Sequence, residues 1–242
     1  QASNYGFAIP YEDLAVRGGF KALNHLILSE YMLVVAFLGY FSVSDRWRWL
    51  LLPVVAYILF SGGGRSSFAL GVGALLIYEF IFGNRLRAAI VCFGGFLIGG
   101  SLIALLDDSL VSRMLFAGGL EQDASFRGRR LQFLLGMEGL PRQILWGDLS
   151  VLVVKFGSLG AYMHNALSVI QFYGIFVFFI YVYALLRAMR ISTRVRLSCE
   201  ASFLDKAFSA LLIYVVLGVL FVKFVGFPIF WLVIGYWLLR HH

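Results

Sequence analysis

Residues 165–187, NALSVIQFYGIFVFFIYVYALLR, are the apolar run on which the choice of fold class rests. A helix needs about 20 mostly apolar residues to cross a bilayer, and this run is long enough. Six further apolar runs occur at residues 24–43, 48–61, 66–83, 88–106, 206–224 and 228–240. The runs at 48–61 and 228–240 are short, which is typical of spans with little tilt or of broken segments. The pattern predicts an all-α, polytopic transmembrane helix bundle of about seven spans.

The composition points to the same class of protein. Hydrophobic residues make up 61% of the 242 residues and charged residues only 14%, with a net charge of +7. Soluble domains average about 45–50% apolar and about 25% charged residues. We therefore expect an integral membrane protein, with the lipid bilayer as a partner. The basic residues are split among loops and show no nucleic-acid-binding motif, so nucleic acid is excluded as a partner. Two cysteines, Cys92 and Cys199, do not suggest a disulfide framework.

The distribution of basic residues predicts the orientation of the spans. Most of the positive charge of the short loops lies in SDRWRW (44–49), GNRLRAA (83–89), RAMRISTRVRLSCEASFLDK (187–206) and Arg240. These segments are therefore expected in the cytoplasm. The N-terminal stretch and a long loop at 107–163 then face outward, toward the periplasm. We treat residues 1–242 as one membrane domain that contains this outer loop. The first 25 residues predict no cleavable signal peptide.

The outer loop is the exception to this charge pattern, because it carries several basic residues on the disfavoured side. Long loops escape the positive-inside bias, which is one explanation. Binding of an anionic ligand is the other, and charge alone leaves both open. Within the loop, SFRGRRLQFLLGMEG (125–139) predicts an amphipathic helix with a broad apolar arc. Arg127 and Arg130 project within that arc and Arg129 lies at its edge, so the first two need a partner.

SGGGRSS (61–67) is a second unusual stretch, because three glycines precede an arginine at the outer end of a span. It lacks the spacing of a Walker phosphate-binding loop. Ser66 or Ser67 can cap the next helix, whose amide groups would lie beside Arg65. A helix N-terminus with an arginine is a ready anion site. The alternative is an ordinary flexible turn whose arginine reaches lipid phosphates.

GAYMHNALSVIQFYG (160–174) places His164 before a long apolar run, with Asn165 as a good N-cap. The positive end of the helix dipole disfavours a charged imidazole, and a neutral imidazole can act as a base near pH 7. The alternative is a histidine that simply lies at the membrane interface. Lys21 and His25, at the outer start of the first span, are expected to border the same cavity.

Acidic residues give a weaker signal. Glu121 with Asp123, and Asp107 with Asp108, resemble short metal-binding motifs, but no histidine or cysteine accompanies them, so no metal site is predicted. Glu30 and Glu79 lie inside predicted spans, where carboxylates are often functional. A transporter or channel with Glu30, Glu79 and Lys223 along its path is therefore the alternative from another class of protein.

The chain resembles the O-antigen ligase and O-antigen polymerase superfamily in the order of three stretches. These are the glycine-arginine turn, the arginine-bearing outer loop and the His-Asn start of the next span. RGGFKALNHLILSEY (17–31) and LPRQILWGD (140–148) are also similar to segments of that family. The resemblance covers the family's C-terminal half, because its members usually have more spans. This sequence departs from the family's pattern in having GGGRSS where Ser-Arg-Gly is commoner, and in having three candidate arginines in the loop helix where the family has one.

The resemblance implies a bacterial inner-membrane glycosyltransferase whose active site faces the periplasm. Its donor would be a polyprenyl-diphosphate-linked glycan, and no cofactor is implied. Catalytic roles would fall on Arg65, Arg130 and His164, and substrate-binding roles on Arg127, Ser66, Asn165, Lys21 and His25. The acceptor would be another glycan, in a polysaccharide polymerase, or a lipid A core, in a ligase. A protein O-oligosaccharyltransferase is a further alternative, and a chain-length regulator protein a further partner.

Overall fold

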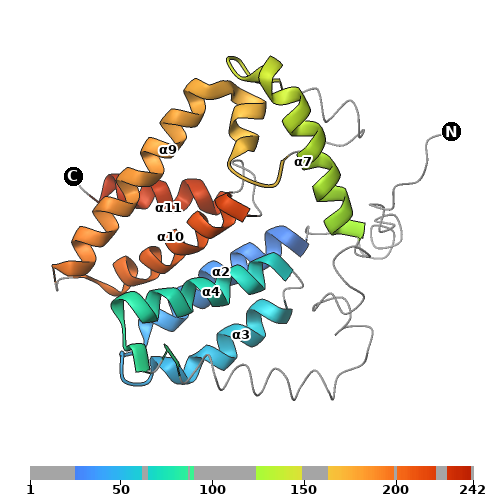
Figure 1. Cartoon of the computed structure of the whole chain (residues 1–242). Coiled ribbons are helices and arrows are strands. Elements are labelled where there is room, and N and C mark those ends of the chain that lie inside the picture. Colours follow the sequence, from blue (N-terminus) through green and yellow to red (C-terminus); the bar gives the residue numbers. More distant parts are fainter. Residues whose placement is uncertain are drawn as a thin grey trace, which may run out of the picture.

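The computed structural model describes residues 25–61, 65–86, 88–89, 124–148, 163–198, 201–221 and 228–240. Every element within these ranges is a helix, which confirms the predicted all-α class (Figure 1). The elements are α2 (His25–Ser42), η1 (Arg48–Leu51), α3 (Leu52–Ser61), α4 (Arg65–Phe82), α7 (Ala124–Gln143), α9 (Leu167–Leu197), α10 (Phe203–Phe221) and α11 (Pro228–Leu239). The predicted run at 88–106 lies almost wholly outside the described residues, as do Lys21 and the acidic pairs at 107–108 and 121–123.

Five of the predicted apolar runs are helices with nearly the expected bounds, namely those at 24–43, 48–61, 66–83, 206–224 and 228–240. By length and composition, α9 and α10 can cross a membrane, with mean hydropathies of 2.2 and 2.0 over their apolar windows. The other apolar helices fall below the length that a membrane span requires by the same criterion. The run at 48–61 begins with the 3₁₀ turn η1 before it becomes α3.

Helix α10 lies at the centre of the bundle and packs against α2, α4, α9 and α11 (Figure 1). Its buried residues recur every three or four positions, as a helix with several neighbours requires: Ala207, Ala210, Leu211, Tyr214, Val215, Gly218 and Val219. The two alanines allow close approach of neighbouring helices. On one side of this core the rings of Tyr181 and Phe230 stack, with centroids 4.3 Å apart.

Helix α9 covers most of the predicted run at 165–187, but it contains a break. Gly174 has φ 83° and ψ 175°, so the helix breaks there into segments 167–173 and 175–197. The second segment extends ten residues beyond the predicted end of the span at residue 187, through the basic stretch to Leu197. The chain turns sharply at this break, so the short segment does not continue the line of the long one (Figure 1). The predicted run at 165–187 is therefore helical and lies within a candidate membrane span, with a break at Gly174 and a later end than predicted.

Ion pairs join the loops that the sequence assigns to the cytoplasm, and they lie at one end of the bundle. Arg48 Nη2 lies 2.8 Å from Glu79 Oε1, and Arg48 Nη1 lies 2.8 Å from Asp45 Oδ1. Lys206 Nζ lies 3.2 Å from the same Asp45 oxygen. Partial burial would raise the pKa of the Asp45 carboxyl, but the charges of Arg48 and Lys206 outweigh it and hold that pKa below its ordinary value.

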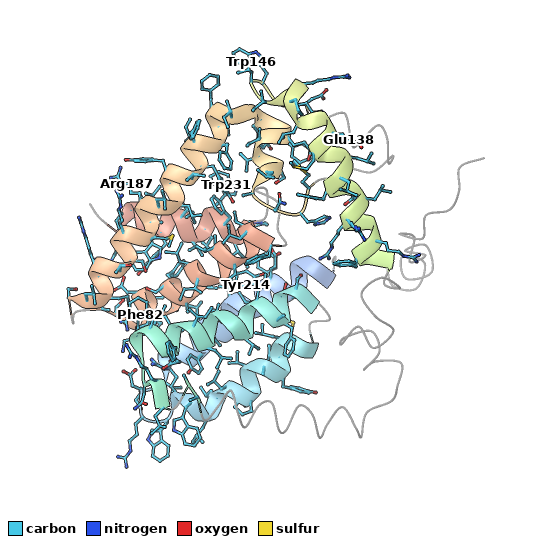
Figure 2. The ribbon with its side chains drawn as sticks, in the orientation of Figure 1. Phe82, Glu138, Trp146, Arg187, Tyr214 and Trp231 are labelled. Carbon is cyan, nitrogen blue, oxygen red and sulfur yellow. The ribbon has the colours of Figure 1, made fainter. Side chains whose placement is uncertain are left out.

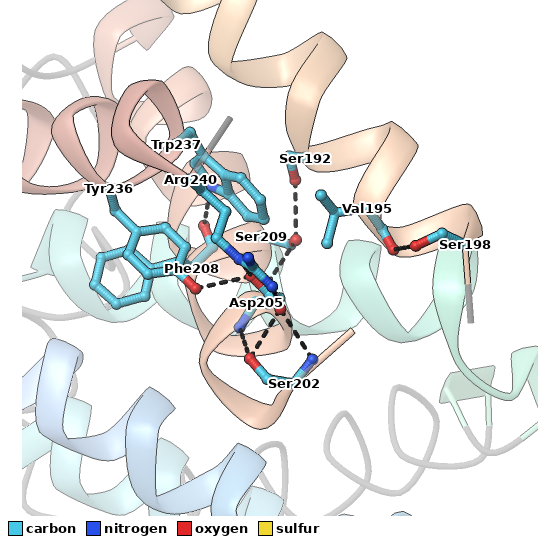
Figure 3. Close-up of polar contacts among 10 residues, drawn as sticks. All are labelled: Ser192, Val195, Ser198, Ser202, Asp205, Phe208, Ser209, Tyr236, Trp237 and Arg240. Carbon is cyan, nitrogen blue, oxygen red and sulfur yellow. Dashed lines mark hydrogen bonds and ion pairs between the residues drawn. The ribbon is translucent and has the colours of Figure 1, made fainter. Parts of the chain in front are cut away.

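Asp205 ties the start of α10 to the end of α11 at the same end of the bundle (Figure 3). Its carboxylate accepts hydrogen bonds from the Ser202 N–H at 2.9 Å, the Tyr236 hydroxyl at 2.8 Å and Arg240 Nε at 3.1 Å. One turn along α10, the hydroxyls of Ser192 and Ser209 lie 2.9 Å apart and link α9 to α10. The predicted cytoplasmic segments therefore share one end, as their charge pattern requires.

Candidate functional site

Helix α7 packs against α9 through a narrow face of small and amide side chains. Gln132, Gly136 and Gln143 are buried, at the spacing of one helix face. A Cβ atom on Gly136 would lie 2.5 Å from Met163 Cγ, so only glycine allows this approach. The predicted helix at 125–139 is confirmed, but its apolar arc does not face the protein. Its exposed members are Phe126, Leu131, Phe133, Leu134 and Met137.

His164 is joined to α7 by a hydrogen bond of 3.1 Å between its Nε2 atom and Gln132 Oε1. An amide oxygen only accepts, so in the tautomer that makes this bond Nε2 carries the proton and Nδ1 is the basic nitrogen. The residue before it, Met163, is fully buried, and its N–H donates to Gln171 Oε1 at 3.2 Å. The histidine predicted as a base thus lies against α7, the helix that carries the three arginines.

Asn165 lies one residue before Ala166, which is the N-cap of α9 in place of the predicted Asn165, but its side chain still bonds the first turn. Its Oδ1 atom accepts a hydrogen bond of 3.0 Å from the Leu167 N–H, and its backbone oxygen accepts one of 2.8 Å from the Ser168 hydroxyl. The first of these bonds satisfies an N–H group that the first turn of a helix leaves unpaired.

The turn after α7 fixes the position of α7 relative to α9, because it forms backbone hydrogen bonds on both sides of the break in α9. The Ile175 N–H donates to the Ile144 oxygen at 2.7 Å, and the Asp148 N–H donates to the Gln171 oxygen at 2.6 Å. Gly147 has φ 69°, and a Cβ there would collide with the backbone of Phe172. Trp146 lies at the tip of this junction, against Phe176 (Figure 2). The junction fixes the position of Gln132 and His164 from one side.

The three loop arginines differ in their surroundings. Arg127 and Arg130, the residues that sequence reasoning favours, are exposed. Arg129 is half-buried and lies three residues before Gln132, on the same face of α7. Sequence reasoning did not single out Gln132 or Gln171 and placed Arg129 last of the three. The signal that identifies this face is the spacing of Gly128, Gln132, Gly136 and Gln143, which the apolar arc obscured.

The glycine-arginine stretch lies partly outside the described residues, namely residues 62–64 and the side chain of Arg65. Helix α4 begins at Arg65, one residue before the predicted run, so Ser66 and Ser67 lie inside the helix and neither is its cap, contrary to the prediction. Ser66 is half-buried, and Ser67 is fully buried and accepts a hydrogen bond of 3.2 Å from the Ser29 hydroxyl. The backbone of His25 begins α2, but its side chain is likewise outside the description. In Figure 1 the N-terminal ends of α2 and α4 point toward the side on which α7 lies.

No family model, curated protein or solved structure matches this chain. The family resemblance therefore rests on the quoted stretches of sequence. Over the residues that the structure describes, no group of three histidine, cysteine, aspartate or glutamate side chains is arranged to hold a metal ion. What the site offers chemically is an imidazole, a buried amide and a helix with three arginines, a set suited to proton transfer beside a bound anion.

Proposed function

We propose that this chain is a glycosyltransferase of the bacterial inner membrane, which moves a glycan from a polyprenyl diphosphate to an acceptor hydroxyl. The observation that carries the proposal is the hydrogen bond between His164 and Gln132, because it joins a base to the helix that bears Arg127, Arg129 and Arg130. Polysaccharide or O-antigen polymerase is the first choice within this class. O-antigen ligase and protein O-oligosaccharyltransferase use the same chemistry with other acceptors.

The proposal includes a bundle of about seven spans with the site on the periplasmic face. Two helices long and apolar enough to cross a membrane support it. The shared end of the basic loops supports it as well, since the positive-inside rule places that end in the cytoplasm. His164 and α7 belong to segments that the alternation of spans then places outside.

The proposed reaction is a displacement at the anomeric carbon of the donor glycan. The acceptor oxygen forms a bond to that carbon while the bond from the carbon to the diphosphate oxygen breaks, which inverts the anomeric centre. The hydroxyl proton passes to His164 Nδ1, and the electron pair of the broken bond leaves with the polyprenyl diphosphate. A positioned base contributes about 10²–10⁴-fold to such a step.

Charge on the departing diphosphate is stabilised by arginines in this mechanism, without a metal ion. Arg65 and Arg130 keep the roles that the family resemblance implies, with Arg127 and Ser66 as binding residues. Arg129 is added because it shares the face of Gln132 on α7. A guanidinium binds phosphate oxygens through two parallel hydrogen bonds, so paired arginines suit a diphosphate. Lys21 and His25 would border the donor at the start of α2.

Glu79, one of the residues that a transport path would need, has a structural role. Glu79 accepts a hydrogen bond of 3.1 Å from the Tyr40 hydroxyl and is paired with Arg48 at 2.8 Å. A carboxylate held in this way accounts for its burial without a transport path.

The test is transfer from a purified polyprenyl-diphosphate glycan, followed by release of polyprenyl diphosphate and by glycan length, with and without a chelator. His164→Ala and Arg129→Ala should each lower the rate at least about 100-fold. Glu138→Gln, an exposed change on α7, should leave it within twofold as the matched control (Figure 2). Full transfer by His164→Ala would refute the proposal, and loss of activity with chelator would refute its metal-free form.

A further inference from the structure

The outward face of α9 changes character abruptly at Leu186. Before that point the face is apolar, and Phe179, Ile180 and Tyr183 are 62%, 67% and 60% exposed. After it the same face carries exposed Arg187, Arg190 and Arg194, at spacings of three and four residues. A single helix face thus passes from apolar to cationic within one turn. The arginine end is at the bottom left of α9 in Figure 1, and Arg187 is labelled in Figure 2.

The arginines line a shallow, open pocket of about 310 Å³ on one face of α9. Its described lining is Tyr183, Leu186, Arg187, Arg190, Ile191 and Arg194, in which each charged residue is an arginine. Arg187 Nη1 lies 3.5 Å from the Tyr183 hydroxyl. At the same end of the bundle, by contrast, Arg48 and Arg240 each contact a carboxylate. Three guanidinium groups along one pocket, with no carboxylate among the described residues that line it, indicate an anionic ligand.

The position along α9 selects the kind of anion. The apolar face ends at Leu186, which sets the edge of the hydrocarbon layer if α9 crosses the membrane as proposed above. Arg187 to Arg194 then extend about 10 Å beyond that edge, at 1.5 Å per residue, which covers the headgroup layer. A lipid whose acyl chains lie along Phe179 and Tyr183 would place its phosphate at these arginines. A free anion in solution would not bind the apolar part of this surface.

We propose that this pocket binds the phosphodiester headgroup of an anionic phospholipid from the cytoplasmic leaflet, with the acyl chains along the apolar face of α9. Arg187 and Arg190 hold the phosphate oxygens, and Arg194 donates a hydrogen bond to a further oxygen of the headgroup. The bound lipid fixes the depth of α9, and through the break at Gly174 it fixes the height of the site on α7. The inference rests on the membrane placement in the proposed function, but not on glycosyl transfer.

The experiment measures lipid binding to the purified full chain in a neutral detergent, by native mass spectrometry and by thermal shift. Phosphatidylglycerol is compared with phosphatidylcholine of the same acyl chains and with inorganic phosphate. The double change Arg187→Gln/Arg190→Gln should weaken phosphatidylglycerol binding about tenfold or more. Arg187→Lys/Arg190→Lys should lie between, because lysine keeps the charge but loses the paired hydrogen bonds.

Arg46→Gln/Arg85→Gln is the matched control, since it removes the same charge from the same end of the bundle. Both of these arginines are exposed and lie over aromatic rings, at 5.4 Å from the Trp47 centroid and 5.6 Å from the Phe80 centroid. This variant should bind phosphatidylglycerol within twofold of the unchanged chain. Equal losses in both variants, equal binding of phosphatidylcholine, or displacement by inorganic phosphate would each overturn the proposal. Lipid binding by His164→Ala should be unchanged, which separates this test from that of transfer.

Discussion

Arg48 shows how this chain accommodates a charge in an apolar bundle. Its side chain is buried, yet its guanidinium contacts both Glu79 and Asp45 at 2.8 Å and lies 4.9 Å from the centroid of the Phe41 ring. Buried ion pairs are costly to form and still more costly to leave half-made. The pair therefore fixes the turn after α2 against the end of α4, rather than adding net stability.

This account predicts opposite outcomes for single and paired changes. Arg48→Met alone should lower the free energy of unfolding by about 3–5 kcal/mol, because it leaves the buried Glu79 carboxylate without its cation. Glu79→Leu alone should cost less, because Arg48 keeps its contact with Asp45. The double variant Arg48→Met/Glu79→Leu should be more stable than Arg48→Met alone. Unfolding of the purified protein by heat or denaturant in detergent measures all three. A double variant as unstable as the sum of the two singles would contradict the argument.

For single residues, the sequence identified candidate site residues more reliably than the helix face that each one occupies. His164 and Asn165 were predicted from a polar pair before an apolar run, and the structure places both at the start of α9. Gln132 and Arg129 were missed because hydrophobic periodicity assigns the apolar arc of α7 to the protein interior. In a membrane protein lipid also accepts apolar side chains, so the buried face can be the polar one. A rule based on burial from water does not distinguish the two.

The break in α9 is a property of two elements acting together. The φ of 83° at Gly174 would be strained for any other residue, and a Cβ there would collide with the backbone of Leu145 in the turn after α7. The glycine thus serves both the turn in its own helix and the docking of its neighbour. The bounds of most helices followed from apolar runs, but this break did not, because a single glycine in an apolar run is usually tolerated within a helix.

Replacing Gly174 therefore tests the junction as a whole. Gly174→Ala should destabilise the protein by about 1–3 kcal/mol or more, since backbone strain and a collision with backbone atoms add. Gly39→Ala is the matched control in α2, where a Cβ would meet no atom within 4 Å, and it should stabilise by about 0.5–1 kcal/mol. Thermal unfolding gives the sign, and limited proteolysis of α7 reports whether that helix is released. Two variants with the same sign would contradict the assigned role of Gly174.

The whole molecule has two chemically different ends. One gathers Arg48, Lys206 and Arg240 with their carboxylates, and the other carries α7 and the junction at Trp146, which is 82% exposed. The sequence predicted the first end, because a charge pattern along alternating spans has few consistent solutions. It could not predict how α7 sits on the second, since that depends on a glycine break and a buried amide rather than on charge or hydropathy.

If the bundle crosses the inner membrane as proposed, these ends face different compartments. In a background with Cys92→Ser and Cys199→Ser, Trp146→Cys should react with a membrane-impermeant maleimide in intact spheroplasts. Ser198→Cys and Ser44→Cys, at exposed positions of the basic end, should react only after the membrane is permeabilised. The physical reason is that the arginines of the basic end are retained in the cytoplasm during insertion. Labelling of Ser198→Cys in intact spheroplasts would reverse the orientation, and with it the periplasmic placement of His164.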